Sequence, residues 1–271
     1  MAHETKWNPP DSLENYKQIN SLKKNYSTDE ITYSFNDDGY RCDSFSIESE
    51  FPILFMGCSL TEGIGLPLNE VWSHHLHNKI VNTTNKNIPF WSLGKGGTSI
   101  DYAARRFYDY SRQLKPKYVF YLMSGISRRE YSYESTDLST WFPNPSKLYK
   151  PSDGFKTMTS IFADPNFATY QTLRSAMILN SVATITNTQI FIFGLNMDAV
   201  IDEQIKIDLF NKFDKIKYFP VSTNQHNTIG IPKTILDRPN KARDNSHHGA
   251  VWQYNLYDTI WELVKNKISK G

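Results

Sequence analysis

One serine and one aspartate–histidine pair have the residue types and spacing that suit acyl-transfer chemistry. Ser59 stands two positions after Gly57, the last residue of the apolar run Pro52–Gly57, which is typical of a short buried strand. Asp244 and His247 lie three residues apart, immediately before the last predicted helix. At this spacing a carboxylate can accept a hydrogen bond from the imidazole Nδ1, which leaves Nε2 free as a general base. A serine hydroxyl becomes a good nucleophile only when such a base takes its proton.

Each of these residues also has a purely structural interpretation. Ser59 can cap a helix that follows the strand, and Asp244 can cap the last helix without any chemistry. Ser59 is not part of a G-x-S-x-G turn, since Thr61 stands where the second glycine would be. The sequence therefore does not support the nucleophile turn of the α/β-hydrolases.

Glycines follow the second predicted strand, in the segment Ser92–Thr98. Glycine lets a backbone approach a ligand closely and leaves its N–H free to donate. The segment lacks the G-K-[ST] ending of a phosphate-binding loop at the required spacing. It also has the simpler interpretation of a tight turn into the next helix.

Apolar runs and helical patterns alternate along the chain, which predicts a three-layer α/β sandwich with a mostly parallel central sheet. Ligands in such folds bind beyond the carboxyl ends of the strands, where Ser59 and the glycine segment fall. Before the sheet, aromatic runs on both sides of Asn36–Gly39 predict a β-hairpin over 31–47. The expected strands are 52–57, 88–93, 117–123, 189–195 and 216–221, and the expected helices are 69–81, 99–114, 168–185, 199–213 and 250–268.

In their order along the chain, these motifs resemble the sequence blocks of the SGNH (GDSL-like) hydrolase superfamily. The resemblance covers residues 31–268 and implies a flavodoxin-like fold of the SGNH type. Gly57-Cys58-Ser59-Leu60-Thr61-x-Gly63 is similar to the first block, Ser92-x-Gly94-x-x-Gly97 to the second, and Asp244-x-x-His247 to the last; Asn36-x-x-Gly39-Tyr40-Arg41 is similar to a segment that precedes the first block in one branch.

The resemblance implies an esterase or deacylase that needs no cofactor or metal. Ser59 would be the nucleophile, His247 the general base, and Asp244 the residue that holds the imidazole in place. The backbone N–H groups of Ser59 and Gly97 would form part of the oxyanion hole. Each such donor typically contributes about 3 kcal/mol to lowering the barrier.

The sequence departs from the family at two positions. Cys58 replaces the aspartate before the nucleophile, and we expect a small buried residue there. Ser127 stands where the family has an asparagine that donates to the oxyanion, and a shorter hydroxyl can still donate. Arg128 or Arg129 could reach in instead and bind an anionic group of the substrate, or both could be paired surface charges.

We expect one domain over 1–271, with an N-terminal extension over 1–50 whose first 30 residues lie on the surface. A long aromatic-rich insertion occupies 129–167. Loops of this length in compact domains are often functional, so the insertion is interpreted as a side wall or lid. Trp141 is its candidate platform for a sugar ring. Packing as a satellite core or an oligomer contact is an equal alternative.

Composition excludes several classes of protein and partner. The 30 Lys and Arg residues nearly balance the 28 Asp and Glu residues, so no strongly basic nucleic-acid surface is expected. Two cysteines are too few for a disulfide framework. No apolar run suits a membrane span and no signal sequence is recognisable, so a cytoplasmic or virion-associated location is expected. His74 and His77 would share a helix face, but without a metal-binding motif they are expected to lie on the surface.

The favoured interpretation is a serine hydrolase that cleaves a small acyl ester, such as an O-acetyl group on a carbohydrate. Its partner would be a small-molecule or glycan ester, and the sequence is compatible with an oligomer. The alternative is a weakly active or inactive scaffold that acts as a carbohydrate-binding or phage virion protein, which the serine at position 127 motivates. A nucleotide-binding protein is poorly supported, because no phosphate-binding motif follows a strand.

Overall fold

The computed structural model describes residues 2–9, 11–19, 25–123, 125, 128–132, 138–141, 164–195, 203–221 and 231–269, with the backbone alone for 131–132, 138–141 and 203. The chain forms two compact units. The first unit contains Met1–Phe55, Ser59–Gly96 and Val221–Gly271, and the second contains Met56–Cys58 and Gly97–Pro220. In the described part of the chain, no helix has the length and apolar character needed to cross a bilayer.

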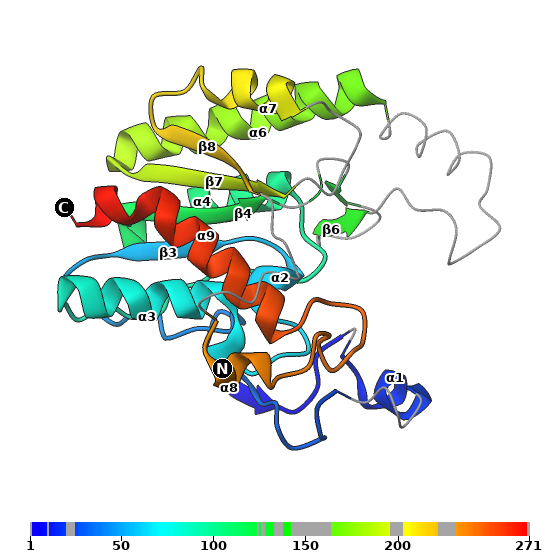
Figure 1. The fold of residues 1–271 in the computed structure, drawn as a ribbon. Coiled ribbons are helices and arrows are strands. Elements are labelled where there is room, and N and C mark those ends of the chain that lie inside the picture. Colours follow the sequence, from blue (N-terminus) through cyan, green and yellow to red (C-terminus); the bar gives the residue numbers. More distant parts are fainter. Residues whose placement is uncertain are drawn as a thin grey trace. The chain divides into compact units, whose positions relative to one another are not determined.

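A four-stranded sheet has the order β3-β4-β7-β8 (Figure 1). β4 and β7 run parallel, with Tyr118 opposite Gln189 at one end of the pairing and Met123 opposite Gly194 at the other. Nearly every residue of β3, β4 and β7 is buried, which explains their continuous apolar sequences. The α/β class predicted from the sequence is confirmed. The bounds are β3 Ile53–Met56, β4 Tyr118–Met123, β7 Gln189–Leu195 and β8 Ile216–Val221.

Long helices pack in pairs within each unit. In the first unit α3 (Trp72–Thr84) packs against α9 (Ala250–Ile268), and in the second α4 (Ile100–Leu114) packs against α6 (Pro165–Thr186). α4 begins where the sequence predicts, because the Ser99 hydroxyl accepts the Tyr102 N–H at 3.2 Å and caps the helix. The shorter helices are α2 (Ser59–Glu62), a 3₁₀ turn at Leu68–Glu70, α7 (Glu203–Phe210) and α8 (Lys233–Leu236).

The prediction of a β-hairpin over 31–47 is wrong. β2 (Tyr33–Phe35) pairs antiparallel with β1 (His3–Thr5) instead of with the residues after the turn. The turn itself forms, and the Asn36 side chain accepts backbone N–H groups that follow it. Beyond the turn, the Asp43 N–H donates to the Phe90 carbonyl at 3.0 Å. The backbone after the turn therefore bonds to Phe90 and not to β2.

The first residues of the chain are also more deeply packed than a surface extension. Asp11 is 1% exposed and Tyr26 is 2% exposed, and both belong to the first unit. Between them lies the short helix α1 (Leu13–Gln18), whose Tyr16 is buried as well. The N-terminal residues therefore take part in the interior of this unit.

The second predicted strand, 88–93, forms only an isolated parallel bridge between Ser92 and Phe55. Phe55 N–H donates to the Trp91 carbonyl, and the Leu93 N–H donates to the Phe55 carbonyl. Pro89 has no N–H to extend this pairing toward the start of the segment. The segment thus follows β3 without becoming a full strand.

Two short strands lie within the insertion predicted over 129–167. β5 (Arg129–Ser132) and β6 (Leu138–Trp141) pair antiparallel, with Arg129 opposite Trp141. Residues 142–163 fall outside the described part of the chain. The interpretation of the insertion as a lid or side wall therefore stays a prediction.

Candidate active site

Ser59 is the first residue of the short helix α2, and two residues separate it from the end of β3. Its carbonyl accepts the N–H groups of Gly63 and Ile64, at 2.9 and 3.1 Å, which closes this tight turn. The Ser59 side chain is half-buried. The end of a buried strand thus presents a serine hydroxyl beside the backbone N–H groups of a new helical turn.

Glycines bring the segment after Ser92 close to the Ser59 turn. A Cβ placed on Gly96 would lie 3.9 Å from the Ser59 Cβ and 2.7 Å from the Ile64 Cδ1. A Cβ placed on Gly94 would lie 3.0 Å from the Glu62 backbone nitrogen. A Cβ on Gly94 would crowd this backbone atom, which favours glycine there, whereas a Cβ on Gly96 would mainly require the end of the Ile64 side chain to shift.

The Asp244 and His247 side chains are hydrogen-bonded as their spacing predicts. The His247 Nδ1 donates to the Asp244 Oδ2 at 2.5 Å. The other carboxylate oxygen, Oδ1, accepts the backbone N–H groups of Ser246 and His247 at 3.1 Å each. The Asp244 side chain is 2% exposed, whereas that of His247 is 19% exposed. The pair therefore holds a fixed tautomer and turns part of the imidazole toward solvent.

Asp244 remains ionised in this setting. Burial alone would raise its pKa, but the hydrogen bond and charge of His247, together with the two backbone donors, outweigh burial and lower the pKa below its usual value. A carboxylate that stays charged beside an imidazole stabilises the imidazolium that forms when the base takes a proton.

Within the first unit, the C-terminal helix α9 contacts the residues that follow Ser59. From α9, the Gln253 side chain donates to the Leu60 carbonyl in α2 at 3.4 Å and accepts the Trp72 N–H at 3.1 Å. Within the described residues, neither Ser59 Oγ nor His247 Nε2 has a hydrogen-bond partner, and the two are not bonded to each other. Catalytic hydrogen bonds are often absent before substrate binds, and the contact between Ser59 and His247 stays a prediction.

The expected oxyanion donors are only partly described. Gly97 has a φ of 77°, which glycine adopts without steric cost, and the next residue, Thr98, donates to the Gly57 carbonyl at 3.4 Å. Gly97 therefore lies near Gly57, the residue that follows β3 and stands two positions before Ser59. The N–H of Gly96 is already bonded to Glu62 Oε2 and is not available. Ser127 lies outside the described residues.

Two buried charged residues that the sequence analysis gave no role hold the Ser59 turn. The Glu62 side chain is 2% exposed and accepts from the Gly96 N–H and from Asn8 Nδ2. Arg41 donates to four backbone carbonyls, those of Thr32, Glu62, Gly63 and Leu66. Burial lowers the Arg41 pKa to about 10, although nearby negative groups oppose that shift. The Asn36-x-x-Gly39-Tyr40-Arg41 motif was the available signal for this structural role.

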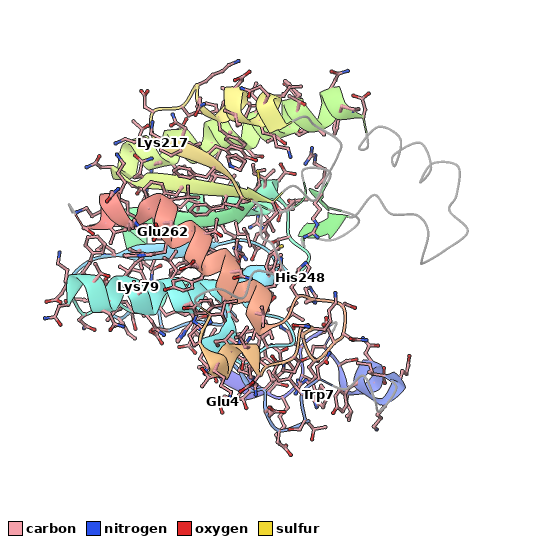
Figure 2. The ribbon with its side chains drawn as sticks, in the orientation of Figure 1. Glu4, Trp7, Lys79, Lys217, His248 and Glu262 are labelled. Atoms are coloured by element: carbon pink, nitrogen blue, oxygen red, sulfur yellow. The ribbon has the colours of Figure 1, made fainter. Side chains whose placement is uncertain are left out.

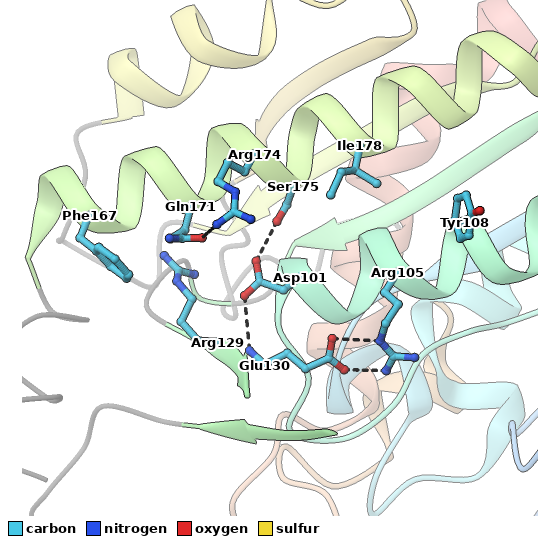
Figure 3. Close-up of a pocket in the computed structure, with 10 residues that line it drawn as sticks. All are labelled: Asp101, Arg105, Tyr108, Arg129, Glu130, Phe167, Gln171, Arg174, Ser175 and Ile178. Carbon is cyan, nitrogen blue, oxygen red and sulfur yellow. Dashed lines mark hydrogen bonds and ion pairs between the residues drawn. The ribbon is translucent and has the colours of Figure 1, made fainter. Parts of the chain in front are cut away.

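Arg129 lines a cavity of about 610 Å³ in the second unit (Figure 3). It is 4% exposed and donates to the carbonyls of Arg128 and Ala168. Arg174, on α6, faces the same cavity and donates to Gln171. Arg128 is half-buried, so neither it nor Arg129 is a simple surface charge. The Trp141 ring is not described.

The histidines of α3 are packed, which corrects the expectation that they lie on the surface. His77 is 8% exposed and its Nε2 donates to the Ile88 carbonyl at 2.8 Å. His75 contacts the rings of Tyr254 and Tyr257, and burial lowers its pKa to about 4. In the part of the chain described, no three His, Cys, Asp or Glu side chains are grouped to hold a metal ion.

His248, next to the catalytic candidate, has a separate role. His248 lies just before the start of α9 (Figure 2). Its ring stacks on that of Trp252, with 4.3 Å between the ring centroids. Burial, Lys241 and His247 together lower its pKa. The His247 ring donates to Asp244, whereas the His248 ring packs on Trp252.

No family model and no curated protein sequence matches the chain. Solved structures of similar fold include TesA, at 14% identity over 79% of this chain and 98% of that chain (TM-score 0.48). They also include the psychrotrophic esterase EstA from Pseudoalteromonas sp., at 14% identity over 79% and 98% (TM-score 0.46). A two-domain esterase active on acetylated mannans matches at 11% identity over 82% of this chain and 50% of that chain (TM-score 0.46). At these identities, residue roles rest on the geometry of this chain.

Proposed function

We propose that the chain is a serine hydrolase that cleaves small acyl esters through Ser59, His247 and Asp244. The observation that carries the proposal is the Asp244–His247 pair, whose Nδ1 is bonded and whose Nε2 is open, in the same unit as a serine at a helix start. The resemblance of the sequence motifs to SGNH hydrolases supports the same three residues. Residue types, order along the chain and local geometry therefore agree.

The reaction would proceed in two displacements. Ser59 Oγ bonds to the acyl carbon while His247 Nε2 takes the hydroxyl proton, and the negative charge develops on the carbonyl oxygen. The bond to the alcohol then breaks, and the alcohol leaves with the proton from His247. Water, deprotonated by His247, attacks the acyl group and releases the acid, which restores Ser59. Backbone N–H groups of Ser59 and Gly97, with the Ser127 hydroxyl, are proposed as the oxyanion donors.

The proposed substrate is an O-acetyl group on a carbohydrate. Trp141 is the proposed sugar platform, and its backbone pairs opposite that of Arg129. Arg129 and Arg174 are proposed to hold an acidic group of a ligand in this cavity, with Arg128 as a neighbouring contact. A cavity of about 610 Å³ falls within the size range usual for small-molecule sites.

The decisive experiment is labelling with a fluorophosphonate, followed by mapping of the modified residue. Label on Ser59, lost in Ser59→Ala and His247→Ala but kept in Ser246→Ala, is the expected result. Turnover of p-nitrophenyl acetate should follow the same pattern. Unlabelled wild type that still binds a glycan would instead favour the carbohydrate-binding scaffold, and label on another serine would exclude Ser59 as nucleophile.

A further inference from the structure

Arg243, the residue directly before Asp244, is a fully buried cation. It is 0% exposed, and its guanidinium faces the carboxylate of Asp11, which is 1% exposed. Arg243 Nε lies 3.1 Å from both carboxylate oxygens, and Nη2 lies 2.7 Å from Oδ2. An ion pair this deeply buried has well-defined geometry, because each directional bond fixes the position of its partner.

The remaining donors of Arg243 also point to the N-terminal residues. Nη1 donates to the Thr28 carbonyl at 3.3 Å, and Nη2 donates to the Lys6 carbonyl. The guanidinium lies over the Trp7 ring, 4.2 Å from its centroid. Lys6, Trp7, Asp11 and Thr28 thus bind one side chain that lies more than 200 positions later in the chain.

The same carboxylate connects Arg243 to the turn that follows Ser59. Tyr33 donates its hydroxyl to Asp11 Oδ2 at 2.6 Å, and accepts the Gly65 N–H at 2.7 Å. Burial and the negative Asp11 raise the pKa of Tyr33, so its hydroxyl stays protonated and can donate. The backbone N–H of Arg243 donates to the backbone carbonyl of Gly65 at 2.8 Å. Gly65 is therefore held on both sides by this network.

Gly65 and the loop before His247 are in direct contact. A Cβ placed on Gly65 would lie 2.8 Å from the Ala242 Cβ, 3.0 Å from the Arg243 nitrogen and 3.3 Å from the Asp244 nitrogen. Within the loop, the Ala242 N–H donates to the His247 carbonyl at 3.2 Å. Any shift of Arg243 would therefore move the backbone on which Asp244 and His247 stand.

A stabilising role does not by itself explain this network. Buried ion pairs contribute little net stability compared with apolar residues of similar size, although loss of one partner is costly. What the network does specify is the position of one loop relative to another. Loss of alignment by about 1 Å can reduce turnover by roughly 100-fold.

We propose that Asp11, Tyr33 and Arg243 form a positioning network that sets the Asp244–His247 loop against the Ser59 turn. The network acts through Gly65 and touches no reacting atom, so these are positioning residues. The inference rests on the proposed function for its effect on turnover. Its effect on the geometry of His247 is independent of that function.

The test compares Tyr33→Phe and Asp11→Asn with wild type. The matched control is Asp29→Asn, an acidic residue of the same segment whose side chain is 74% exposed. NMR of ¹⁵N-histidine-labelled protein follows the Nδ1–H resonance of His247, which a bond to a buried carboxylate shifts downfield. Both test variants should move or broaden this resonance, and the control should not. Circular dichroism and thermal melting establish that each variant is folded.

Kinetics on p-nitrophenyl acetate provide the second readout. Tyr33→Phe should lower kcat roughly tenfold with KM within about twofold, because alignment is disturbed and substrate contacts are not. If wild type shows no turnover, the proposed function fails, while the His247 resonance still decides the inference. An unchanged resonance in folded Tyr33→Phe would overturn it. Should Asp11→Asn not fold, Tyr33→Phe carries the test alone.

Discussion

Asp244, the carboxylate proposed to orient His247, is held by its local hydrogen bonds. Its two oxygens accept three hydrogen bonds, from the His247 ring and from the N–H groups of Ser246 and His247. The bonds favour the ionised form and so hold the pKa below its usual value, although burial acts in the opposite direction. The folded state therefore binds the proton less readily than the unfolded chain does.

This difference predicts a specific dependence of stability on pH. A lowered pKa contributes stability that is present above roughly pH 4, the unfolded value, and that is lost as pH falls through the folded value. Wild type should be more stable than Asp244→Asn at neutral pH, and the difference should shrink only below roughly pH 4. Urea titrations of both proteins across this range measure the difference. A difference that shrinks between pH 8 and 5 would contradict the prediction.

At the scale of elements, the approach of one backbone to another determines where the loops of the first unit meet. Gly65 and Gly39 both have positive φ, 76° and 78°, so an added side chain strains the backbone similarly at either position. Only Gly65 faces close neighbours, whereas a Cβ on Gly39 would meet nothing within 4 Å. A comparison of alanine substitutions at the two glycines therefore separates the cost of backbone strain from the cost of steric overlap.

Gly65→Ala should destabilise the protein more than Gly39→Ala. The extra cost should be about 1–3 kcal/mol, since the neighbours of Gly65 include backbone atoms that cannot easily move. Chemical denaturation of the two variants measures the difference in free energy of unfolding. Equal losses would show that the loop around Arg243 can yield, and that the close approach is not constraining.

The cavity between α4 and α6 belongs to the second unit and has its own charge arrangement. Arg105 is paired with Glu130 through two hydrogen bonds, at 3.0 and 2.6 Å. Arg129 and Arg174 instead donate to neutral acceptors. Because Arg105 and Glu130 neutralise each other, the positive charge of this cavity comes from Arg129 and Arg174. The negative charge of Asp101 lies near Arg129.

Arg174→Gln should therefore weaken binding of acidic ligands and leave neutral ones unaffected. A charged hydrogen bond contributes about 1.5–3 kcal/mol, so the Kd for a sugar with a carboxylate should rise about 10-fold or more. Arg112→Gln, at the end of α4, is the control. Isothermal titration with glucuronate and glucose gives the comparison. An equal effect on both sugars would argue against an anion site.

At the scale of the whole molecule, one buried ion pair joins residues 232 positions apart in sequence, Asp11 and Arg243. Removal of one partner leaves a charge buried without compensation, whereas removal of both does not. The stability of the first unit therefore depends on its two chain ends being held together.

Asp11→Ala should lower the free energy of unfolding by about 3–5 kcal/mol. Asp11→Ala combined with Arg243→Met should recover a large part of this loss, because no unpaired charge then remains. Denaturation of wild type, the two single variants and the double variant forms a complete cycle. Additive losses would indicate that the pair is not coupled in solution.

Local patterns in the sequence determined the α/β class, the position of α9 and the Asp244–His247 contact, because each depends on residues near one another in the chain. Apolar runs of four to seven residues identify buried strands, and a spacing of three positions brings a carboxylate to an imidazole within one loop. Only the tertiary structure decided that β2 pairs with β1, that Glu62 and Arg41 hold the Ser59 turn, and that Asp11 binds Arg243. These contacts join distant segments, and their energy depends on burial, which no local spacing encodes.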